Sequence, residues 1–398
     1  MGKRPMALWT CIGATAVASL GFAACGSSDD DASTAASTSA ASVSTTAASA
    51  GDSDVAARVA AAKKPNPTDY EGPTEPVKPP AKPLKLALIS CSSALRGCVT
   101  PLEGAAEAVK NFGWTTQMLD GKGDPKAQNE AFLAAVSGGA DAIIYTSIDP
   151  NLIQQGLTAA KKAGIPVLST SAGWSDPNPT VEYPGKEAPQ FDVSHNVPEE
   201  GKQVADWVIN DSGGKAKVLL VVDPAFGLPS VYINAAKKQL EEACPDCEVK
   251  QMNVAGTQLA TTGPGQVVGF LRSNPDFTYV LAPYDPAASA FVPAITQAGL
   301  TNVKMCSILG LQENVQFIRD GRIQACDGAW DNRYMGYATV DQLLRLLAKQ
   351  EPAKPLGENT PYVLLDKDNL PPEGEDWTAP FEYRQKFLDL WGVGNGSN

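Results

Sequence analysis

Residues 138–169 read GGADAIIYTSIDPNLIQQGLTAAKKAGIPVLS and contain a strand, a helix and the next strand. Residues 142–146 are apolar throughout, which is typical of a strand buried on both faces of a sheet. A helix is expected to begin at Asp149 and to end at Gly164, and residues 166–169 form the following strand. A strand that returns through a helix after such short links lies parallel to the first. The stretch therefore predicts a parallel sheet with helices packed on its faces.

The same alternation extends over residues 84–398 and restarts once. An irregular segment at 171–193, rich in Pro, Gly and Asp, separates the two parts. The first part is expected to hold further strands at 84–90 and 115–119 and helices at 100–112 and 124–137. The second is expected to hold strands at 217–222, 248–254, 277–281, 303–308, 323–325 and 362–365, and helices at 197–210, 231–243, 266–273, 287–298, 313–320, 334–349 and 381–390. We therefore expect an α/β fold with two Rossmann-like lobes in tandem, each with a parallel sheet.

The N-terminal residues have the features of a secretory signal. A basic start at Lys3, an apolar run at 7–24 and small residues before Cys25 follow the order of such a signal. The hexapeptide LGFAAC at 20–25 resembles a lipobox, which directs lipid to a new N-terminal cysteine. We expect a signal peptide at 1–24 and lipid on Cys25, which would place the chain outside the cytoplasm with a lipid anchor as its only membrane attachment. The alternatives are an uncleaved anchor helix and a plain signal cut elsewhere.

Residues 25–83 are expected to form a lipid-bearing tether. Residues 26–50 are almost entirely Ser, Ala, Thr and Asp, and residues 63–83 are rich in Pro and Lys. Neither part has enough apolar surface to offset the entropy of ordering, so both are expected to be disordered, with transient helix at 55–62. The tether would either let the folded part reach partners in the membrane or serve as a spacer through cell-wall polymer.

Six cysteines remain once Cys11 leaves with the signal and Cys25 takes lipid. An even number of cysteines in an exported chain indicates disulfides. Six cysteines allow fifteen connectivities. The pairs closest in sequence are the expected ones: Cys91–Cys98, Cys244–Cys247 and Cys306–Cys326. A metal site is not expected, because the chain has one histidine and thiolates need a reducing compartment.

Charge and motifs argue against two classes of protein. The net charge is −12 and no basic stripe is present, so nucleic acid is not an expected partner. The one histidine, His195, has no Gly-x-Ser-x-Gly elbow to act with. No P-loop or Gly-x-Gly-x-x-Gly motif follows a strand. We therefore expect no catalytic residues and no cofactor.

Several short stretches, in this order, resemble the type I periplasmic binding proteins of ABC importers, in the ribose/galactose-like group. The resemblance spans about residues 84–391. The stretches are GGADAII (138–144), KKAGIPV (161–167), NPDF (274–277), QAGL (297–300), IRDG (318–321) and FLDLWG (387–392). The resemblance implies a monomer that holds a small-molecule ligand between two lobes and works with an ABC permease and ATPase.

The resemblance also implies how the chain divides into lobes. The lobes would be joined by a hinge, with the chain crossing near Asn196, Trp330 and Tyr362. Residues 84–196 plus 330–361 would form the N-terminal lobe. Residues 197–329 plus 362–398 would form the C-terminal lobe and tail.

Ligand would lie where the carboxyl ends of the strands of both lobes meet. The candidate ligand-binding residues there are Ser92, Ser93, Arg96, Ser147, Ser171, Trp174, Phe226, Tyr284, Asp285, Trp330 and Asp331. Aromatic faces can sandwich a sugar ring or another flat ligand, and carboxylates and serines can hold hydroxyls. Arg96 could instead bind a carboxylate. Ordinary packing is the alternative role for each aromatic, and capping of the following helix is the alternative for Asp285.

The strand ends depart from the pattern of ribose-type receptors. Ser171 and Ala172 stand near the position of the usual Asp–Arg pair, Tyr284 replaces the Asn of an Asn–Asp pair, and the usual Asp near Leu309 is absent. A simple pentose or hexose is therefore doubtful, and a more apolar, aromatic or modified ligand is at least as plausible. The expected function is ligand capture and delivery to an ABC importer. The alternatives are a ligand-binding co-receptor for a membrane sensor and a secreted enzyme.

Overall fold

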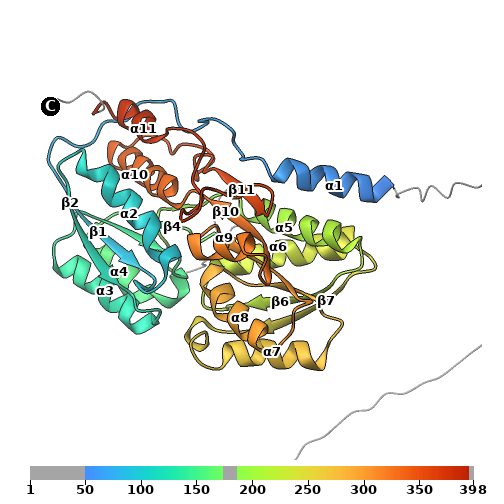
Figure 1. The fold of residues 1–398 in the computed structure, drawn as a ribbon. Coiled ribbons are helices and arrows are strands. Elements are labelled where there is room, and N and C mark those ends of the chain that lie inside the picture. The colour runs from blue at the N-terminus through green and yellow to red at the C-terminus, as the bar shows by residue number, and fades with distance from the viewer. Residues whose placement is uncertain (1–49, 174–185, 394–398) are drawn as a thin grey trace, which may run out of the picture. The chain divides into compact units, whose positions relative to one another are not determined.

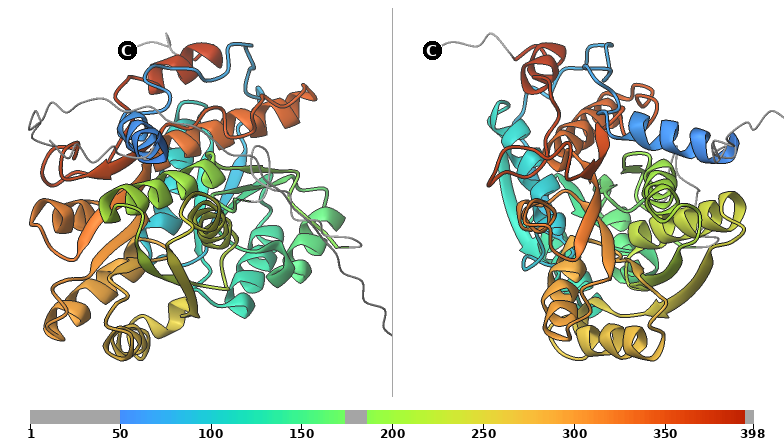
Figure 2. Two further views of the ribbon diagram at one scale, coloured as in Figure 1. Left: turned by 90° about the vertical axis from the view of Figure 1, so that its right-hand side faces the viewer. Right: turned by 45° about the vertical axis from the view of Figure 1, so that its right-hand side comes forward.

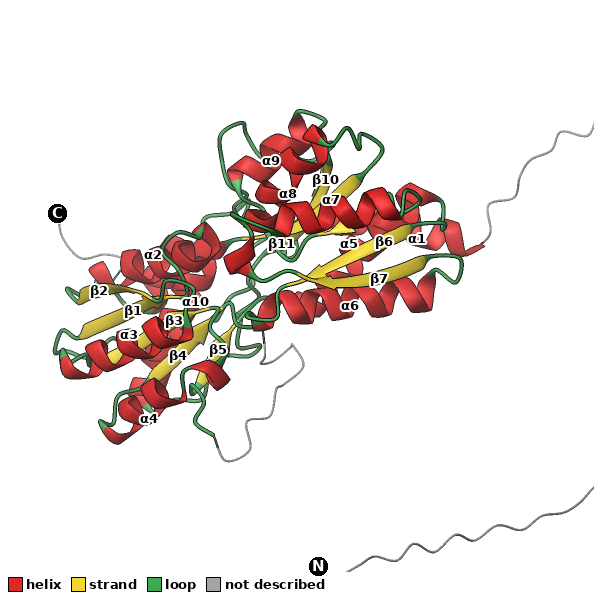
Figure 3. Cartoon of the chain, turned by 90° about the horizontal axis from the view of Figure 1, so that it is seen from below, coloured by secondary structure: helices red, strands yellow, loops and turns green. Residues whose placement is uncertain are grey.

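The computed structural model describes residues 50–173 and 186–393, with side chains from residue 54 onward. Residues 54–393 of this part form two α/β lobes, each built on its own sheet (Figure 1). Seen from below, the two sheets lie beside one another with helices packed around each (Figure 3). The expected fold class is confirmed. The signal peptide and Cys25 lie outside the described residues.

The sheet of the first lobe has the strand order β2-β1-β3-β4-β5, and all neighbouring strands are parallel. Its elements are β1 (Lys85–Ser90), α2 (Arg96–Lys110), β2 (Thr115–Asp120), α3 (Pro125–Ser137), β3 (Ala142–Thr146), η1 (Pro150–Leu152), α4 (Gln154–Lys162), β4 (Val167–Thr170), β5 (Phe191–Val193) and α10 (Asn332–Ala348). Leu86 and Leu88 pack in one core cluster, and Ala87 and Ile89 pack in another with Phe132 of α3. This alternation follows from the two-residue repeat of a strand.

The sheet of the second lobe has the order β11-β10-β9-β8-β6-β7. Its neighbours are parallel except for β10 and β11, which are antiparallel. Its elements are α5 (Val197–Ser212), β6 (Lys217–Val222), α6 (Gly227–Ala243), β7 (Glu248–Asn253), η2 (Gly256–Gln258), α7 (Gly263–Ser273), β8 (Tyr279–Leu281), α8 (Asp285–Gln297), β9 (Lys304–Leu309), α9 (Gln312–Arg319), β10 (Gln324–Trp330) and β11 (Tyr362–Asp366). Between β1 and β11 the chain passes between the lobes three times: from β5 to α5, from β10 to α10, and from α10 to β11.

Near the crevice between the lobes, β5 and α2 differ from expectation, and α6 begins at Gly227, four residues before its expected start. The segment at 171–193, expected to be irregular, contains β5, which extends the first sheet beside β4. Helix α2 begins at Arg96, four residues before the expected start. Thr100 was expected near the helix start, yet its hydroxyl donates to the Arg96 carbonyl one turn earlier at 3.1 Å, as a residue inside a helix does.

Residues 54–83, expected to be a disordered tether, pack on the lobes; we call them the strap. Helix α1 (Ala50–Ala62) lies along α5 and buries Val55 and Val59 (Figure 2). The Arg58 guanidinium donates from Nε and Nη2 to the two carboxylate oxygens of Asp206 in α5, at 2.7 and 2.9 Å. The prediction was wrong here because two valines at helical spacing and one ion pair suffice when another helix supplies the matching surface.

The rest of the strap crosses the hinge and ends on the first lobe. Asn66 exchanges backbone hydrogen bonds with Tyr362 of β11, at 2.9 and 3.0 Å. The Tyr70 ring packs edge-on against Phe387 with centroids 5.9 Å apart. Val77 is 1% exposed. The strap therefore contacts the second lobe through α1 and Asn66, and the first lobe through Tyr70 and through the Glu75 carbonyl, which accepts from Arg345 of α10 at 2.8 Å.

The C-terminal residues were expected in the second lobe, and β11 does lie in its sheet. Helix α11 (Arg384–Leu390) instead packs on α10 of the first lobe. Trp391 stacks on Tyr337 with centroids 5.9 Å apart, and its Nε1 donates to Asp341 at 2.7 Å. The tail therefore returns to the first lobe because α10 offers it both an aromatic face and a buried hydrogen-bond acceptor.

The expected cysteine pairs are disulfide-bonded. Cys91–Cys98 links the end of β1 to α2, with a Cα–Cα distance of 5.5 Å. Cys244–Cys247 staples the turn after α6, at 5.3 Å. Cys306–Cys326 joins the adjacent strands β9 and β10, at 4.7 Å.

Candidate functional site

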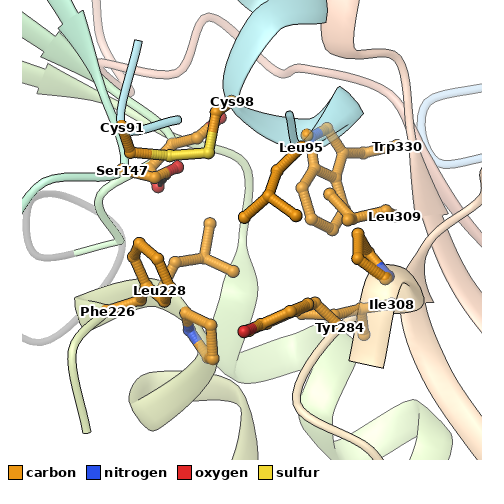
Figure 4. A pocket seen from close by; sticks show the side chains of 14 residues that line it. Cys91, Leu95, Cys98, Ser147, Phe226, Leu228, Tyr284, Ile308, Leu309 and Trp330 are labelled. Atoms are coloured by element: carbon orange, nitrogen blue, oxygen red, sulfur yellow. Dashed lines mark hydrogen bonds between the residues drawn. A yellow bond between two sulfur atoms is a disulfide. The ribbon is translucent and has the colours of Figure 1, made fainter. Parts of the chain in front are cut away.

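A pocket lies between the lobes, where strands of both sheets end (Figure 4). The space between its walls, open solvent at its mouth included, is about 460 Å³. The first lobe supplies residues that follow β1, β3 and β4, and the second lobe supplies residues near the ends of β6, β8, β9 and β10. The lining residues are Cys91, Leu95, Gly97, Cys98, Ser147, Ser171, Phe226, Leu228, Pro229, Tyr284, Pro286, Ile308, Leu309 and Trp330.

The backbone turns sharply at three strand ends that line the pocket. Ser147, Ser171 and Leu309 have φ values of 54°, 57° and 129°, in a region that non-glycine residues rarely occupy. Backbone hydrogen bonds hold the two serines in place, from Ser147 N to Thr170 O and from Ser171 N to Val193 O, both at 3.0 Å. Such conformations persist only where the surrounding structure enforces them, and they cluster at binding sites.

Aromatic side chains form two sides of the pocket. The Trp330 indole is 1% exposed and stacks on the His195 ring, with centroids 4.1 Å apart and planes at 22°. Across the pocket in Figure 4, the Phe226 and Tyr284 rings meet edge to face at 5.9 Å. These rings offer flat apolar surface to a ligand.

The hydroxyl groups on the wall already have partners within the protein. Ser147 Oγ donates to the Ser171 carbonyl at 2.9 Å, and Ser171 Oγ lies 3.0 Å from Met335 Sδ. Tyr284 Oη donates to Asp223 Oδ2 at 2.6 Å. Burial raises the pKa of Asp223, although this hydrogen bond opposes the shift. Burial and the nearby Asp223 carboxylate both raise the pKa of Tyr284, so its phenol stays protonated.

A buried carboxyl pair, Asp285 and Asp327, holds the wall at Leu309 in place. Asp285 Oδ2 accepts from Leu311 N at 2.8 Å, and Asp327 Oδ1 accepts from Gly310 N at 3.3 Å. Ser307 Oγ donates to Asp285 and lies 3.4 Å from Asp327. Burial raises the pKa of Asp285 to about 7, and burial together with the Asp285 charge raises the pKa of Asp327 well above its usual range. At neutral pH the pair therefore keeps at least one proton.

The structure brings five of the predicted ligand-binding residues together in the pocket: Ser147, Ser171, Phe226, Tyr284 and Trp330. Trp174 lies outside the described residues. Ser92 and Ser93 belong to the turn after β1, where Ser92 Oγ accepts from Ala94 N and Ser93 N donates to Asp120. Arg96 lies in a neighbouring hollow and pairs with Asp376 at 3.2 Å.

The two predicted carboxylates do not line the pocket. Asp331 is the N-cap of α10, where Oδ1 accepts from Tyr334 N at 2.8 Å and Oδ2 accepts from Ala379 N at 2.9 Å. Asp285 accepts from Ser307 and Leu311, behind Leu309. Both side chains are at most 1% exposed and accept hydrogen bonds from backbone or serine donors of the protein. Their predicted contact with ligand stays a prediction.

Most of the remaining wall is apolar and was not predicted. Leu95, Leu228, Pro229 and Ile308 carry no polar atom that would distinguish them from core residues in a sequence. Cys91 was predicted for its disulfide and not for its place in the pocket. The sequence offered one signal for pocket residues of this kind, which is a position directly after an expected strand. Cys91 and Leu309 have that position.

Within residues 50–173 and 186–393, no three His, Cys, Asp or Glu side chains are grouped so that they could hold a metal ion. In those same ranges no helix combines the length and apolar character needed to cross a bilayer.

A family model described as a periplasmic binding protein domain matches residues 94–351, which is well over half of the chain. The chain belongs to the periplasmic binding proteins. The expected resemblance is confirmed, and the type I fold fits the ribose/galactose-like group. Membership of this family implies a location outside the cytoplasm.

Two relatives of this periplasmic binding protein are named for the polyol or sugar that they bind. A xylitol-binding protein of Mycolicibacterium smegmatis is 23% identical over 275 residues, which are 67% of this chain and 72% of that protein. A D-apiose import binding protein of Actinobacillus succinogenes is 22% identical over 275 residues, 67% of this chain and 83% of that protein. Both are solute-binding proteins, which is consistent with a chain that is not an enzyme.

Solved structures share the fold of this periplasmic binding protein. An ABC sugar transporter subunit from Rhodobacter sphaeroides superposes with a TM-score of 0.62 at 20% identity, covering 72% of this chain and 99% of that one. A solute-binding protein from Agrobacterium vitis with bound allitol gives 0.62 at 17% identity, covering 73% and 98%. At these identities the likeness shows the fold alone.

Proposed function

We propose that this chain captures one small molecule between its lobes and delivers it to the permease of an ABC importer, from a lipid anchor at Cys25. The observation that supports ligand capture is the pocket itself, because its wall combines residues of both lobes at the carboxyl ends of parallel strands. A ligand that contacts both walls binds the closed arrangement better than an open one, and so draws the lobes together.

Delivery is tested by identifying the ligand and following its uptake. The full chain with Cys25→Ser, purified in solution, is incubated with a small-molecule extract, and the retained compound is released and identified by mass spectrometry. We expect one molecule per chain. Uptake of that compound should fall in a strain that lacks the protein. Unchanged uptake in that strain would contradict delivery.

A pocket-filling variant links uptake to the pocket. Leu95 is partly buried on the pocket wall, so Leu95→Trp fills the empty space. The matched control is Leu152→Trp, because the Leu152 side chain is 37% exposed and lies outside the pocket. We expect the control to restore uptake in the deletion strain and Leu95→Trp to fail, with both variants equally folded.

The anchor is tested by metabolic labelling with an alkyne fatty acid. The wild-type chain should carry the label and fractionate with membranes, whereas Cys25→Ser should be unlabelled. Label on the Cys25→Ser chain would contradict lipid attachment at this cysteine.

A further inference from the structure

The pocket wall lacks the groups that a polyhydroxylated ligand needs. Among the described residues that line it, none is charged. Moving a ligand hydroxyl from water into a pocket costs binding free energy when the hydroxyl finds no hydrogen-bond partner there. Each further unpaired hydroxyl adds to that cost. Sugars and polyols therefore need a wall with several free donors and acceptors.

Three carboxylates that adjoin lining residues of this pocket, in the chain or through a hydrogen bond, are occupied. Asp331 accepts two backbone N–H groups at 2.8 and 2.9 Å. Asp285 accepts from Ser307 Oγ and Leu311 N. Asp223 accepts from Tyr284 Oη and from Ala225 N, the latter at 3.0 Å. A ligand hydroxyl that took one of these oxygens would leave a buried protein donor with a weaker partner.

The hydroxyl groups on the wall likewise donate their hydrogen bonds to acceptors within the protein. Ser147 donates to the Ser171 carbonyl and Tyr284 donates to Asp223. What remains for a ligand is mostly hydrocarbon and ring surface, from Leu95, Leu228 and Trp330, together with the Cys91–Cys98 disulfide (Figure 4). This surface is suited to an apolar skeleton.

Among the side-chain nitrogen and oxygen atoms of the described lining residues, one has no hydrogen-bond partner. Trp330 Nε1 is buried and has no hydrogen-bond partner in the described part of the chain. An indole N–H can only donate, so a single acceptor on the ligand would satisfy it. Buried polar groups of native proteins are nearly always paired, which makes this N–H a candidate for ligand recognition.

From these contacts we infer that the ligand is a compact, uncharged and largely apolar molecule with a hydrogen-bond acceptor for Trp330, and not a sugar or polyol. This inference rests on the proposed function and names the ligand class for the same pocket. It separates this protein from relatives whose names specify xylitol or D-apiose.

The test is calorimetric titration of the full chain carrying Cys25→Ser. The probes are three ring ketones (cyclohexanone, acetophenone and camphor) and two polyhydroxylated compounds, xylitol and D-arabinose. We expect at least one ketone to bind with a Kd at least about tenfold below that of either polyhydroxylated compound. The inference is overturned if xylitol or D-arabinose binds more tightly than every ketone, or if no ketone binds up to its solubility limit.

The role of the indole is tested with Trp330→Phe, which keeps the ring and removes the N–H. The best ketone is compared with the hydrocarbon of the same skeleton, such as ethylbenzene for acetophenone. We expect the variant to weaken ketone binding by about three- to tenfold and to leave the hydrocarbon unchanged. Equal losses for both probes would show that the ring acts by packing alone and would overturn the assignment of the acceptor.

A polar group on the wall should weaken ketone binding. Leu95→Gln adds an amide to the pocket, and Leu152→Gln is the matched exposed control. We expect only Leu95→Gln to weaken ketone binding, by about tenfold. The outcome also separates the two proposals. An imported polyol among the retained compounds would leave the proposed function standing and overturn the ligand class, whereas deletion without effect on uptake of any retained compound would overturn the proposed function.

Discussion

The His195 ring lies against the Trp330 indole, with centroids 4.1 Å apart and planes at 22°. Trp330 is part of the pocket wall, and His195 belongs to the first crossover between the lobes. Glu200, near the start of α5, lies 3.0 Å from His195 Nε2 through its Oε2. The pocket wall is therefore supported from behind by the chain segment that would bend when the lobes move.

Replacing His195 should lower the stability of the protein. His195→Ala removes a 2%-exposed ring, opens a cavity behind Trp330 and leaves the buried Glu200 carboxyl without this partner. We expect a loss of about 2–4 kcal/mol in the free energy of unfolding, measured in urea. Trp330→Phe, which leaves the His195–Glu200 contact in place, should lose much less. Equal losses would contradict a supporting role for His195.

Stability should fall as pH rises, because of the Asp285–Asp327 pair. Both carboxyls have a raised pKa in the folded protein, about 7 for Asp285, and titrate near 4 when unfolded. Between about pH 4 and 7 the folded state binds more protons than the unfolded state. The free energy of unfolding therefore declines over that window, by up to about 1.4 kcal/mol per pH unit for each proton. Below about pH 4 the protonated pair makes its full stabilising contribution to the free energy of unfolding.

The measurement is urea unfolding at pH 5 and pH 7.5. Asp327→Asn keeps the shape of the side chain and removes its titration, so the decline between the two pH values should be smaller than in the wild type. Asp246→Asn, on the exposed turn after α6, should leave the decline unchanged. A decline of the same size in Asp327→Asn would show that other groups cause it.

The strap should stabilise the protein through Arg58. Arg58→Ala removes both hydrogen bonds to Asp206, whose carboxylate is then left with Gln239 at 2.7 Å. Because Asp206 is buried, we expect a loss of about 1–3 kcal/mol and faster amide exchange in α1. Lys126→Ala breaks the exposed pair with Glu130 and serves as the control, with a change within about 0.5 kcal/mol. An unchanged exchange rate in α1 would argue against ordered packing of the strap.

The Cys91–Cys98 disulfide should affect ligand affinity as well as stability. It lines the pocket and ties the start of α2 to the end of β1, next to Leu95, the N-cap of α2, and Gly97 in its first turn, which both line the wall. The double Ala variant of this pair should bind ligand several-fold more weakly, and its free energy of unfolding should fall by about 2–4 kcal/mol. The double Ala variant of Cys244 and Cys247, far from the pocket, should lose stability without loss of affinity. Equal affinity in both variants would contradict the role of the first pair in the wall.

Much of the architecture was predictable because its signals are local. Apolar runs such as 142–146 and 217–222, and helix stops such as Gly164 and Gly299, lie in the same place in the structure as in the sequence. β5 was missed because three residues without a stop signal carry little periodicity. The strap was misjudged because composition measures how much apolar surface a segment has, and not whether a neighbouring helix fits it.

The location of the pocket could be predicted from the sequence, but the chemical nature of its wall could not. Ser147, Ser171 and Tyr284 were found because residues after parallel strands gather at one edge of a sheet. That Asp285 and Asp331 turn away from this edge depends on which backbone N–H groups lie near them, and those groups belong to residues 26 and 48 positions further along the chain.

The sequence by itself therefore determined the two-lobed α/β fold, the disulfide partners and the edge where ligand would meet the protein, since each depends on short-range pattern or spacing. Only the tertiary structure decided that this edge consists mostly of hydrocarbon and a disulfide, and that the buried Trp330 Nε1 has no hydrogen-bond partner among the described residues. The physical reason is that a side chain's availability depends on every donor and acceptor around it, and folding brings those together from both lobes.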